Sequence, residues 1–165
     1  MAGGEATAWR VAAIVVGIGI LIAYVVLSGR WVSTGDSWYV NLQKPWWQPP
    51  SVVFGLIWPY NFVVLGIAAV LIPLRAPTHV VAVFLGFFGA SVACAIAWAY
   101  LFYVPHSLTA SAIALSLAAL LTIPILVAAF NAAPWLAVAL LPYQVWVVIA
   151  ASLSWGYVAL ASGRG

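Results

Sequence analysis

The sequence predicts an all-α membrane protein, a five-transmembrane-helix bundle with a Trp/Pro-rich first loop as its lid. Of the 165 residues, 67% are hydrophobic and only 4% are charged, which is too little charge to cover a soluble globular domain. Five apolar runs are each long enough for a transmembrane helix, which needs roughly 20 residues. These runs are too long for barrel strands, so a helical bundle is favoured over a membrane β-barrel.

The five spans are expected to follow one another in a single membrane domain, residues 1–165. Their expected bounds are about 9–27, 51–74, 78–103, 106–130 and 135–161. The first ends at a Ser28-Gly29-Arg30 break, and the second begins directly after Pro50. The joint between the third and fourth spans is short and uncharged, which predicts a tight antiparallel hairpin.

The loop between the first two spans, residues 31–50, is rich in proline and tryptophan. Its prolines at Pro45, Pro49 and Pro50 lack an N–H and exclude an ordinary helix over this stretch. Its tryptophans favour a half-apolar setting, such as the membrane–water boundary. We therefore expect this loop to fold down as a lid over the ends of the helices.

The charged residues lie near the ends of the apolar runs or between them, as the cost of burying charge in lipid requires. The net charge of +3 is spread over separate loops and makes no basic patch, so nucleic-acid binding is not expected. The two acidic residues, Glu5 and Asp36, are expected outside the spans. Paired carboxylates, a metal-ligand cluster and a nucleophile–base set are missing from the sequence, which disfavours hydrolysis, ion-coupled transport and a metal site.

Basic residues on the two sides of the predicted bundle favour one orientation. Arg30, Lys44 and Arg164 lie on one side, and Arg10 and Arg75 lie on the other. Three basic residues on one side against two on the other favour a cytoplasmic first loop and C-terminus by the positive-inside rule.

Small residues recur along one side of the third span, at Gly86, Gly89, Ala90 and Ala93. Such stripes let helix backbones approach closely in lipid. They indicate either packing inside the bundle or the face of a homodimer.

Aromatic residues at helical spacing predict the walls of a pocket. Phe54, Trp58 and Phe62 share a face of the second span, and Trp98 and Phe102 share a face of the third. A further stripe in the last span comprises Tyr143, Trp146, Ala150, Ser154 and Tyr157. If these faces converge beneath the lid, they suit a flat, largely apolar ligand whose carboxylate could meet Lys44 at the rim. The alternative is that the rings only fill the bundle or anchor its helices.

Two motifs add a family resemblance that covers the chain from Trp38 onward. The first, W-Y-x-x-L-x-K-P-x-W-x-P-P, is matched by Trp38, Tyr39, Leu42, Lys44, Pro45, Trp47, Pro49 and Pro50. The second, L-P-Y-x-x-W-V-x-x-A, is matched by Leu141, Pro142, Tyr143, Trp146, Val147 and Ala150. With these motifs the chain resembles the tryptophan-rich TspO family, also called the translocator protein or peripheral benzodiazepine receptor family.

The resemblance implies a five-helix bundle, often dimeric, with a pocket under the first loop. Family members bind tetrapyrroles such as protoporphyrin IX and haem, sterols and synthetic ligands, and some bacterial members degrade protoporphyrin in light. Trp58 and Trp146 map to the pocket tryptophans, and Trp47, Pro49 and Pro50 map to the lid. Motif and stripes together predict a ligand site of Trp38, Tyr39, Lys44, Trp47, Pro49, Pro50, Phe54, Trp58, Phe62, Ala95, Trp98, Ala99, Phe102, Tyr143, Trp146, Ala150 and Ser154.

Four positions depart from the family pattern by losing hydrogen-bonding capacity. Ala95 and Ala99 replace the asparagine and serine of L-N-x-x-W-S, Phe62 replaces a tyrosine, and Ser154 replaces an asparagine. These changes predict a more apolar pocket, suited to an isoprenoid, carotenoid or sterol-like lipid.

Three functions remain open from the sequence. The first is a membrane receptor for a flat hydrophobic ligand, acting in its transport or sensing without an obligatory cofactor. The second is a light-dependent, protoporphyrin-degrading enzyme with Trp58 and Trp146 as redox-active side chains. The third is a pigment-binding or structural accessory subunit of a larger membrane complex.

Overall fold

Five long helices and one short helix make up the computed structural model, which describes residues 2–32 and 35–163. The helices are α1 (Ala2–Trp31), α2 (Ser37–Asn41), α3 (Ser51–Arg75), α4 (Thr78–Tyr103), α5 (Leu108–Ala132) and α6 (Pro134–Ala161). Each of the helices except α2 is long and apolar enough to cross a membrane. The predicted all-α bundle of five spans is therefore confirmed, whereas Arg164 lies outside the described residues.

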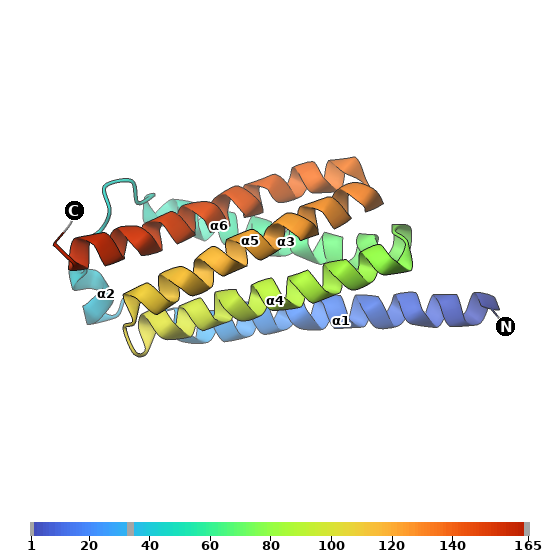
Figure 1. Ribbon diagram of the computed structural model, residues 1–165, viewed down its shortest axis with the longest axis horizontal. Coiled ribbons are helices and arrows are strands. Elements are labelled where there is room, and N and C mark those ends of the chain that lie inside the picture. The colour runs from blue at the N-terminus through green and yellow to red at the C-terminus, as the bar shows by residue number, and fades with distance from the viewer. Residues whose placement is uncertain (1, 33–34, 164–165) are drawn as a thin grey trace.

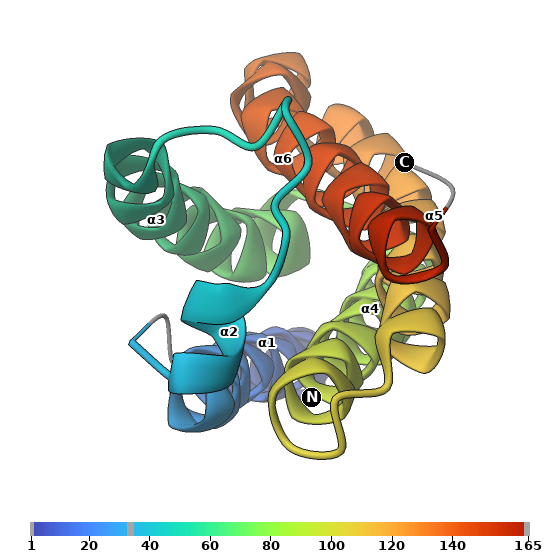
Figure 2. The same cartoon turned by 90° about the vertical axis from the view of Figure 1, so that its left-hand side faces the viewer.

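The five long helices run nearly side by side along the molecule (Figure 1). Seen from the end that holds α2, they follow one another around the bundle in the order α1, α3, α6, α5 and α4 (Figure 2). The chain after α2 arcs past the end of α6 before it enters α3. The loop therefore covers one mouth of the bundle, which is the lid geometry expected from its prolines and tryptophans.

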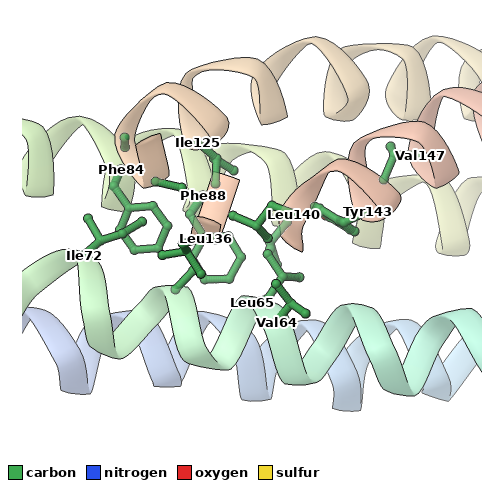
Figure 3. Close-up of a cluster of buried hydrophobic side chains, with 14 of the residues drawn as sticks. Val64, Leu65, Ile72, Phe84, Phe88, Ile125, Leu136, Leu140, Tyr143 and Val147 are labelled. Atoms are coloured by element: carbon green, nitrogen blue, oxygen red, sulfur yellow. The ribbon is translucent and has the colours of Figure 1, made fainter. Parts of the chain in front are cut away.

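The densest packing lies in the half of the bundle away from the lid. Phe84 and Phe88 of α4 stack with ring centroids 5.4 Å apart and are fully buried. Ile72 and Leu136 approach them from α3 and α6 (Figure 3). A Cβ added at Gly17 of α1 would lie 3.1 Å from the Ala69 side chain, so these two helices nearly touch. Close packing at this end leaves the lid end as the place for a cavity.

A proline pair explains how α1 is held against the end of α3. Pro77 has no N–H, so the Pro73 carbonyl four residues earlier lacks its usual helical partner. The Arg10 guanidinium donates a hydrogen bond to this carbonyl. Pro73 itself lies inside α3, within the predicted second span.

The first helix is longer than predicted at both ends. It runs over Ala2–Trp31 instead of about 9–27, and the Ser28-Gly29-Arg30 break does not end it. The Ser28 hydroxyl donates to the Tyr24 carbonyl inside the helix, and the Val32 N–H reaches the Ser28 carbonyl at 3.1 Å. Glu5 consequently lies in the first helical turn, where the positive end of the helix dipole favours an acid, and not outside the span.

Two further boundaries also differ from the prediction. The loop 31–50 contains the short helix α2, whose start is capped by Asp36: its Oδ1 accepts from the Trp38 N–H at 2.8 Å. The fourth span begins at Leu108 and not at 106, because His106 has a φ of 54° and the Ser107 N–H instead donates to the Leu101 carbonyl at 2.9 Å.

Candidate functional site

A cavity of about 840 Å³ lies beneath the lid and is bounded by all five long helices. Its size falls in the range of small-molecule and cofactor sites, roughly 300–1,000 Å³. The lid covers its water-facing end with Tyr39, Lys44, Gln48, Pro49 and Pro50. The cavity is therefore large enough for a polycyclic ligand and is shielded from the aqueous side.

Most of the residues predicted from the sequence line this cavity. They are Tyr39, Lys44, Pro49, Pro50, Phe54, Trp58, Phe62, Ala95, Trp98, Phe102, Trp146, Ala150 and Ser154. Four predicted residues lie away from it, namely Trp38, Trp47, Ala99 and Tyr143. The aromatic faces of α3, α4 and α6 thus do converge, as their helical spacing suggested.

Two of the four outlying residues hold the lid in place. Trp38 stacks on His106 with ring centroids 3.9 Å apart, which fixes α2 to the α4–α5 turn. Trp47 donates its indole N–H to the Ser152 hydroxyl on α6 at 3.3 Å. Both tryptophans pack the lid onto the bundle and do not face the space beneath it.

The other two outlying residues are buried in helix contacts. Ala99 is fully buried within the bundle. Tyr143 is buried in the core of the bundle. Residues that share a helical face with cavity residues therefore do not all reach the cavity.

One wall of the cavity is a cluster of three rings from α1 and α3. Trp58 and Phe62 are stacked, with centroids 5.4 Å apart and an interplanar angle of 29°. Tyr24 presents its edge to both, at 5.9 Å from Trp58 and 5.5 Å from Phe62. Such edge-to-face contacts hold the rings in place, which leaves a preformed flat surface for a ligand.

The opposite wall is formed by α4 and α6. Trp98 and Phe102 are stacked at 5.9 Å, and the Trp98 N–H donates to the Ser154 hydroxyl at 3.1 Å. Ser154 in turn donates to the Ala150 carbonyl at 3.1 Å. Each of these polar groups has a partner within the protein, whereas the buried indole N–H of Trp146 on α6 has none among the described residues.

Polar groups gather at the lid end of the cavity. The Tyr157 hydroxyl donates to Gln48 Oε1, and Gln48 Nε2 lies 3.5 Å from the Tyr39 hydroxyl. The Lys44 ammonium lies 5.3 Å from the centroid of the Tyr39 ring. Among the described residues that line the cavity, Lys44 is the only one with a full charge. The cavity therefore has an apolar body and a polar, cationic rim.

Sequence reasoning missed several residues that line the cavity. They are Tyr24, Val25, Ser28, Gly29, Val32, Gln48, Ser51, Gly55, Tyr103, Leu115, Val147, Leu153 and Tyr157. Tyr157 could have been included, because it continues the Tyr143–Ser154 stripe at helical spacing. The α1 residues gave no such signal, since that helix is apolar on every side.

The part of the chain that the structure describes holds no group of three or more side chains arranged to bind a metal ion. The aromatic walls and the cationic rim fit an organic ligand instead.

Comparison with known proteins supplies an independent finding. The model of the TspO/MBR family matches residues 11–160 of this chain. A tryptophan-rich sensory protein of Cereibacter sphaeroides is 26% identical over 140 residues, covering 82% of this chain and 87% of the relative. Protein CrtK of Rhodobacter capsulatus is 29% identical over 130 residues, covering 78% and 81%. The human translocator protein is 28% identical over 123 residues, covering 73% of each chain.

Proposed function

This chain belongs to the TspO/MBR family, and from that premise we propose that it is a membrane receptor for a flat hydrophobic ligand held in the cavity beneath the lid. Five apolar spans and family membership make it an integral, multi-pass membrane protein. The observation that supports the proposal most is the cavity of about 840 Å³ between two walls of stacked rings. The relatives named for sensing and translocation favour a role in sensing or moving the ligand.

The polar rim narrows the ligand class within this proposal. A tetrapyrrole, a sterol-like lipid and an isoprenoid would each fit the apolar body of the cavity. Only an acidic ligand would gain from the Lys44 ammonium, which has the Tyr39 hydroxyl and the Gln48 amide nearby. An acidic tetrapyrrole is therefore expected to place its rings on Trp58 and Trp98 and its carboxylates at Lys44.

A titration with matched ligands tests this proposal. Protoporphyrin IX, its dimethyl ester, a sterol and a carotenoid are titrated against the purified protein by quenching of tryptophan fluorescence. Lys44→Gln should weaken the binding of the diacid by about fivefold to tenfold, in line with roughly 1–1.5 kcal/mol for an exposed charged contact. The dimethyl ester should bind the variant and the wild type alike.

Arg75→Gln provides the control, because Arg75 ends α3 at the far end of the bundle from the lid. It should leave the affinity for every ligand unchanged. If none of the four ligands binds the wild-type protein, the receptor proposal fails. If both variants weaken the binding of protoporphyrin IX equally, the effect comes from the change in net charge and not from the position of Lys44 at the rim.

A photochemical function is the second candidate, because Trp58 and Trp146 both line the cavity. Phe54 contacts the Trp146 ring at 4.9 Å, which leaves an electron-rich pair beside any bound ring system. Illumination of the protein with protoporphyrin should then bleach the pigment, and Trp58→Phe with Trp146→Phe should slow the bleaching without abolishing binding. Equal bleaching in the variant would exclude this role.

A pigment-carrying or structural accessory subunit is the third candidate, and a visible spectrum separates it from the others. A protein purified gently from its native membrane should show a Soret-type band for a tetrapyrrole or a three-peaked blue band for a carotenoid.

We also propose a cytoplasmic lid, because Arg30 and Lys44 lie at that end of the bundle. Labelling of a cysteine introduced at Gln43 in intact cells tests this orientation.

A further inference from the structure

The cavity reaches the outer surface of the bundle through one side, between α1 and α3. Val25 of α1 and Val32, which directly follows α1, line it, and they are 42% and 39% exposed. Gly29 of α1 and Gly55 of α3 also line the cavity and are exposed. Exposed residues on two adjacent helices that line the same cavity indicate an opening between these helices.

Below this opening, the two helices are in close contact. Their contacts include Gly17 with Ala69, Leu21 with Gly66, and Tyr24 with Phe62. Nearer the lid, a Cβ added at either Gly29 or Gly55 would meet nothing within 4 Å. In Figure 2, α1 and α3 lie apart at this end, and α2 lies between them in this view. The helices thus form a V that is closed at its base and open toward the lid.

The neighbouring seams at the same end of the bundle are bridged by side chains. Trp31 and Tyr100 join α1 to α4 with ring centroids 5.4 Å apart. Phe54 and Trp146 join α3 to α6 at 4.9 Å. On the remaining side, α5 lies between α4 and α6, and Trp98 of α4 donates a hydrogen bond to Ser154 of α6. At the lid end, described side chains therefore bridge the seams on either side of the opening between α1 and α3.

Apolar side chains lie beside the opening, and Arg30 follows Gly29 in the last turn of α1 toward the lid. Val26 of α1 and Val52 and Leu56 of α3 lie beside the opening, and Leu56 is 71% exposed. In a transmembrane helix such side chains face lipid acyl chains. The polar groups of the cavity, in contrast, lie at the lid, which covers the aqueous end. In a membrane, these apolar side chains would turn the opening toward the acyl chains of the bilayer.

We propose that the hydrophobic ligand moves between the bilayer and the cavity sideways, through the opening bounded by Gly29 and Gly55. The proposal rests on the proposed function for the nature of the ligand, but the passage itself is a property of the fold. A molecule that partitions into lipid would reach the site without crossing water or displacing the lid. Its polar end would pass close to the headgroup region, since Val32 and Ser51 border the opening beside the lid.

The passage can be tested without knowing the ligand. A fatty acid that bears a diazirine on its acyl chain is placed in liposomes with the wild-type protein and photoactivated, and labelled residues are mapped by mass spectrometry. Label is expected on Trp58 and Phe62 inside the cavity and on Leu56 outside it. The double variant Gly29→Phe and Gly55→Phe should lose the label inside the cavity and keep the label on Leu56.

Gly19→Phe is the matched control. Gly19 lies on the exposed face of α1, has nothing within 4 Å of an added Cβ, and does not line the cavity. This variant should be labelled like the wild type. The proposal is overturned if the double variant is still labelled inside the cavity, or if the wild type is labelled on Leu56 alone.

Binding rates supply the second measurement. Protoporphyrin IX delivered from liposomes should bind to and leave the double variant at least about tenfold more slowly than the wild type, a barrier increase of about 1.4 kcal/mol. Both rates should fall together, because a blocked passage slows entry and exit alike. Faster release with a lower affinity would show that Gly29 and Gly55 belong to the binding surface, and the passage would be rejected. If residues inside the cavity are labelled but no candidate ligand binds, the receptor proposal is rejected and the passage is still supported.

Discussion

Ala95 and Phe62 face the cavity with side chains that cannot hydrogen-bond, at two positions where the family pattern has asparagine and tyrosine. Ala99, the third such replacement, is fully buried away from the cavity and so does not change its polarity. Ser154 does line the cavity, but its hydroxyl already accepts from Trp98. At the scale of single residues, the apolar character of the site therefore depends on Ala95 and Phe62.

Restoring these two groups should favour polar ligands. The variant Ala95→Asn with Phe62→Tyr is expected to bind protoporphyrin IX more tightly by about fivefold for each hydrogen bond formed, at roughly 1 kcal/mol each. A carotenoid or sterol should bind no better, because it has little to pair with the new groups. Parallel titrations of both ligand classes measure the difference. Ala99→Ser is the control and should bind as the wild type does; a gain for the control equal to that of the variant would contradict this account.

Asn61 is the most unusual polar residue in the bundle. It is fully buried on α3, and neither its amide nitrogen nor its amide oxygen has a hydrogen-bond partner among the described residues. An unpaired amide in an apolar interior costs about 1–3 kcal/mol. Asn61→Leu should therefore raise the free energy of unfolding by a similar amount, measured by denaturation in detergent. Asn131→Leu is a suitable control, because that amide is exposed and donates to the Val127 carbonyl at 2.8 Å. A loss of stability at Asn61 would mean that its amide is paired in the membrane.

At the scale of elements, the lid depends on one glycine of α6. A Cβ at Gly156 would lie 2.6 Å from Pro45 Cγ and 2.8 Å from Trp47 Cζ2, so only glycine leaves room for the lid there. The proline and tryptophan motif of the lid and the glycine of the last helix therefore form one contact, although more than a hundred residues separate them.

Substitution of this glycine should loosen the lid without unfolding the bundle. Gly156→Leu is expected to push Pro45 and Trp47 off α6 and to break the hydrogen bond from Trp47 to Ser152. Hydrogen exchange measured by mass spectrometry should rise in the peptide over residues 42–50 and stay constant in α4 and α5. Gly19→Leu is the size-matched control. Unchanged exchange in the lid would show that the lid is held by its α2 end alone.

At the scale of the whole molecule, the small-residue stripe of α4 can now be divided into two parts. Gly89 lies 3.7 Å, measured from an added Cβ, from the Ile20 side chain of α1, so it packs within the bundle. Gly86, Ala90 and Ala93 are exposed on the outer surface. The predicted homodimer through α4 thus remains a prediction, with its face reduced to the three exposed residues.

Two leucines should disrupt such a dimer. Gly86→Leu with Ala90→Leu would keep the backbones of two copies apart, because association in lipid depends on their close approach. Light scattering in detergent should then give a monomer mass in place of a dimer mass, whereas Gly19→Leu should leave the mass unchanged. A dimer that persists in the double variant would show that this face is covered by lipid.

Much of the architecture follows from local properties of the chain. The number of spans follows from the length of the apolar runs, and the span at Thr78–Tyr103 has the bounds expected. The lid follows from its prolines, which cannot continue a helix. The helix boundaries that differ, at Ser28 and His106, depend on a side-chain hydrogen bond inside the helix and on a left-handed turn, which hydropathy does not report.

Only the tertiary structure decided which apolar residues face the cavity, the core or the lipid. Trp46 and Trp47 are neighbours in one motif, yet Trp46 is 91% exposed while Trp47 packs on α6. For the same reason, the sequence did not reveal that α1 lines part of the cavity, or that the cavity opens at Gly29 and Gly55. In a water-soluble protein, polarity distinguishes the outward side of a helix from the side that faces the core, whereas in a bilayer both sides are apolar. The sequence therefore determined the spans and their lid. Packing alone determined what each span surrounds.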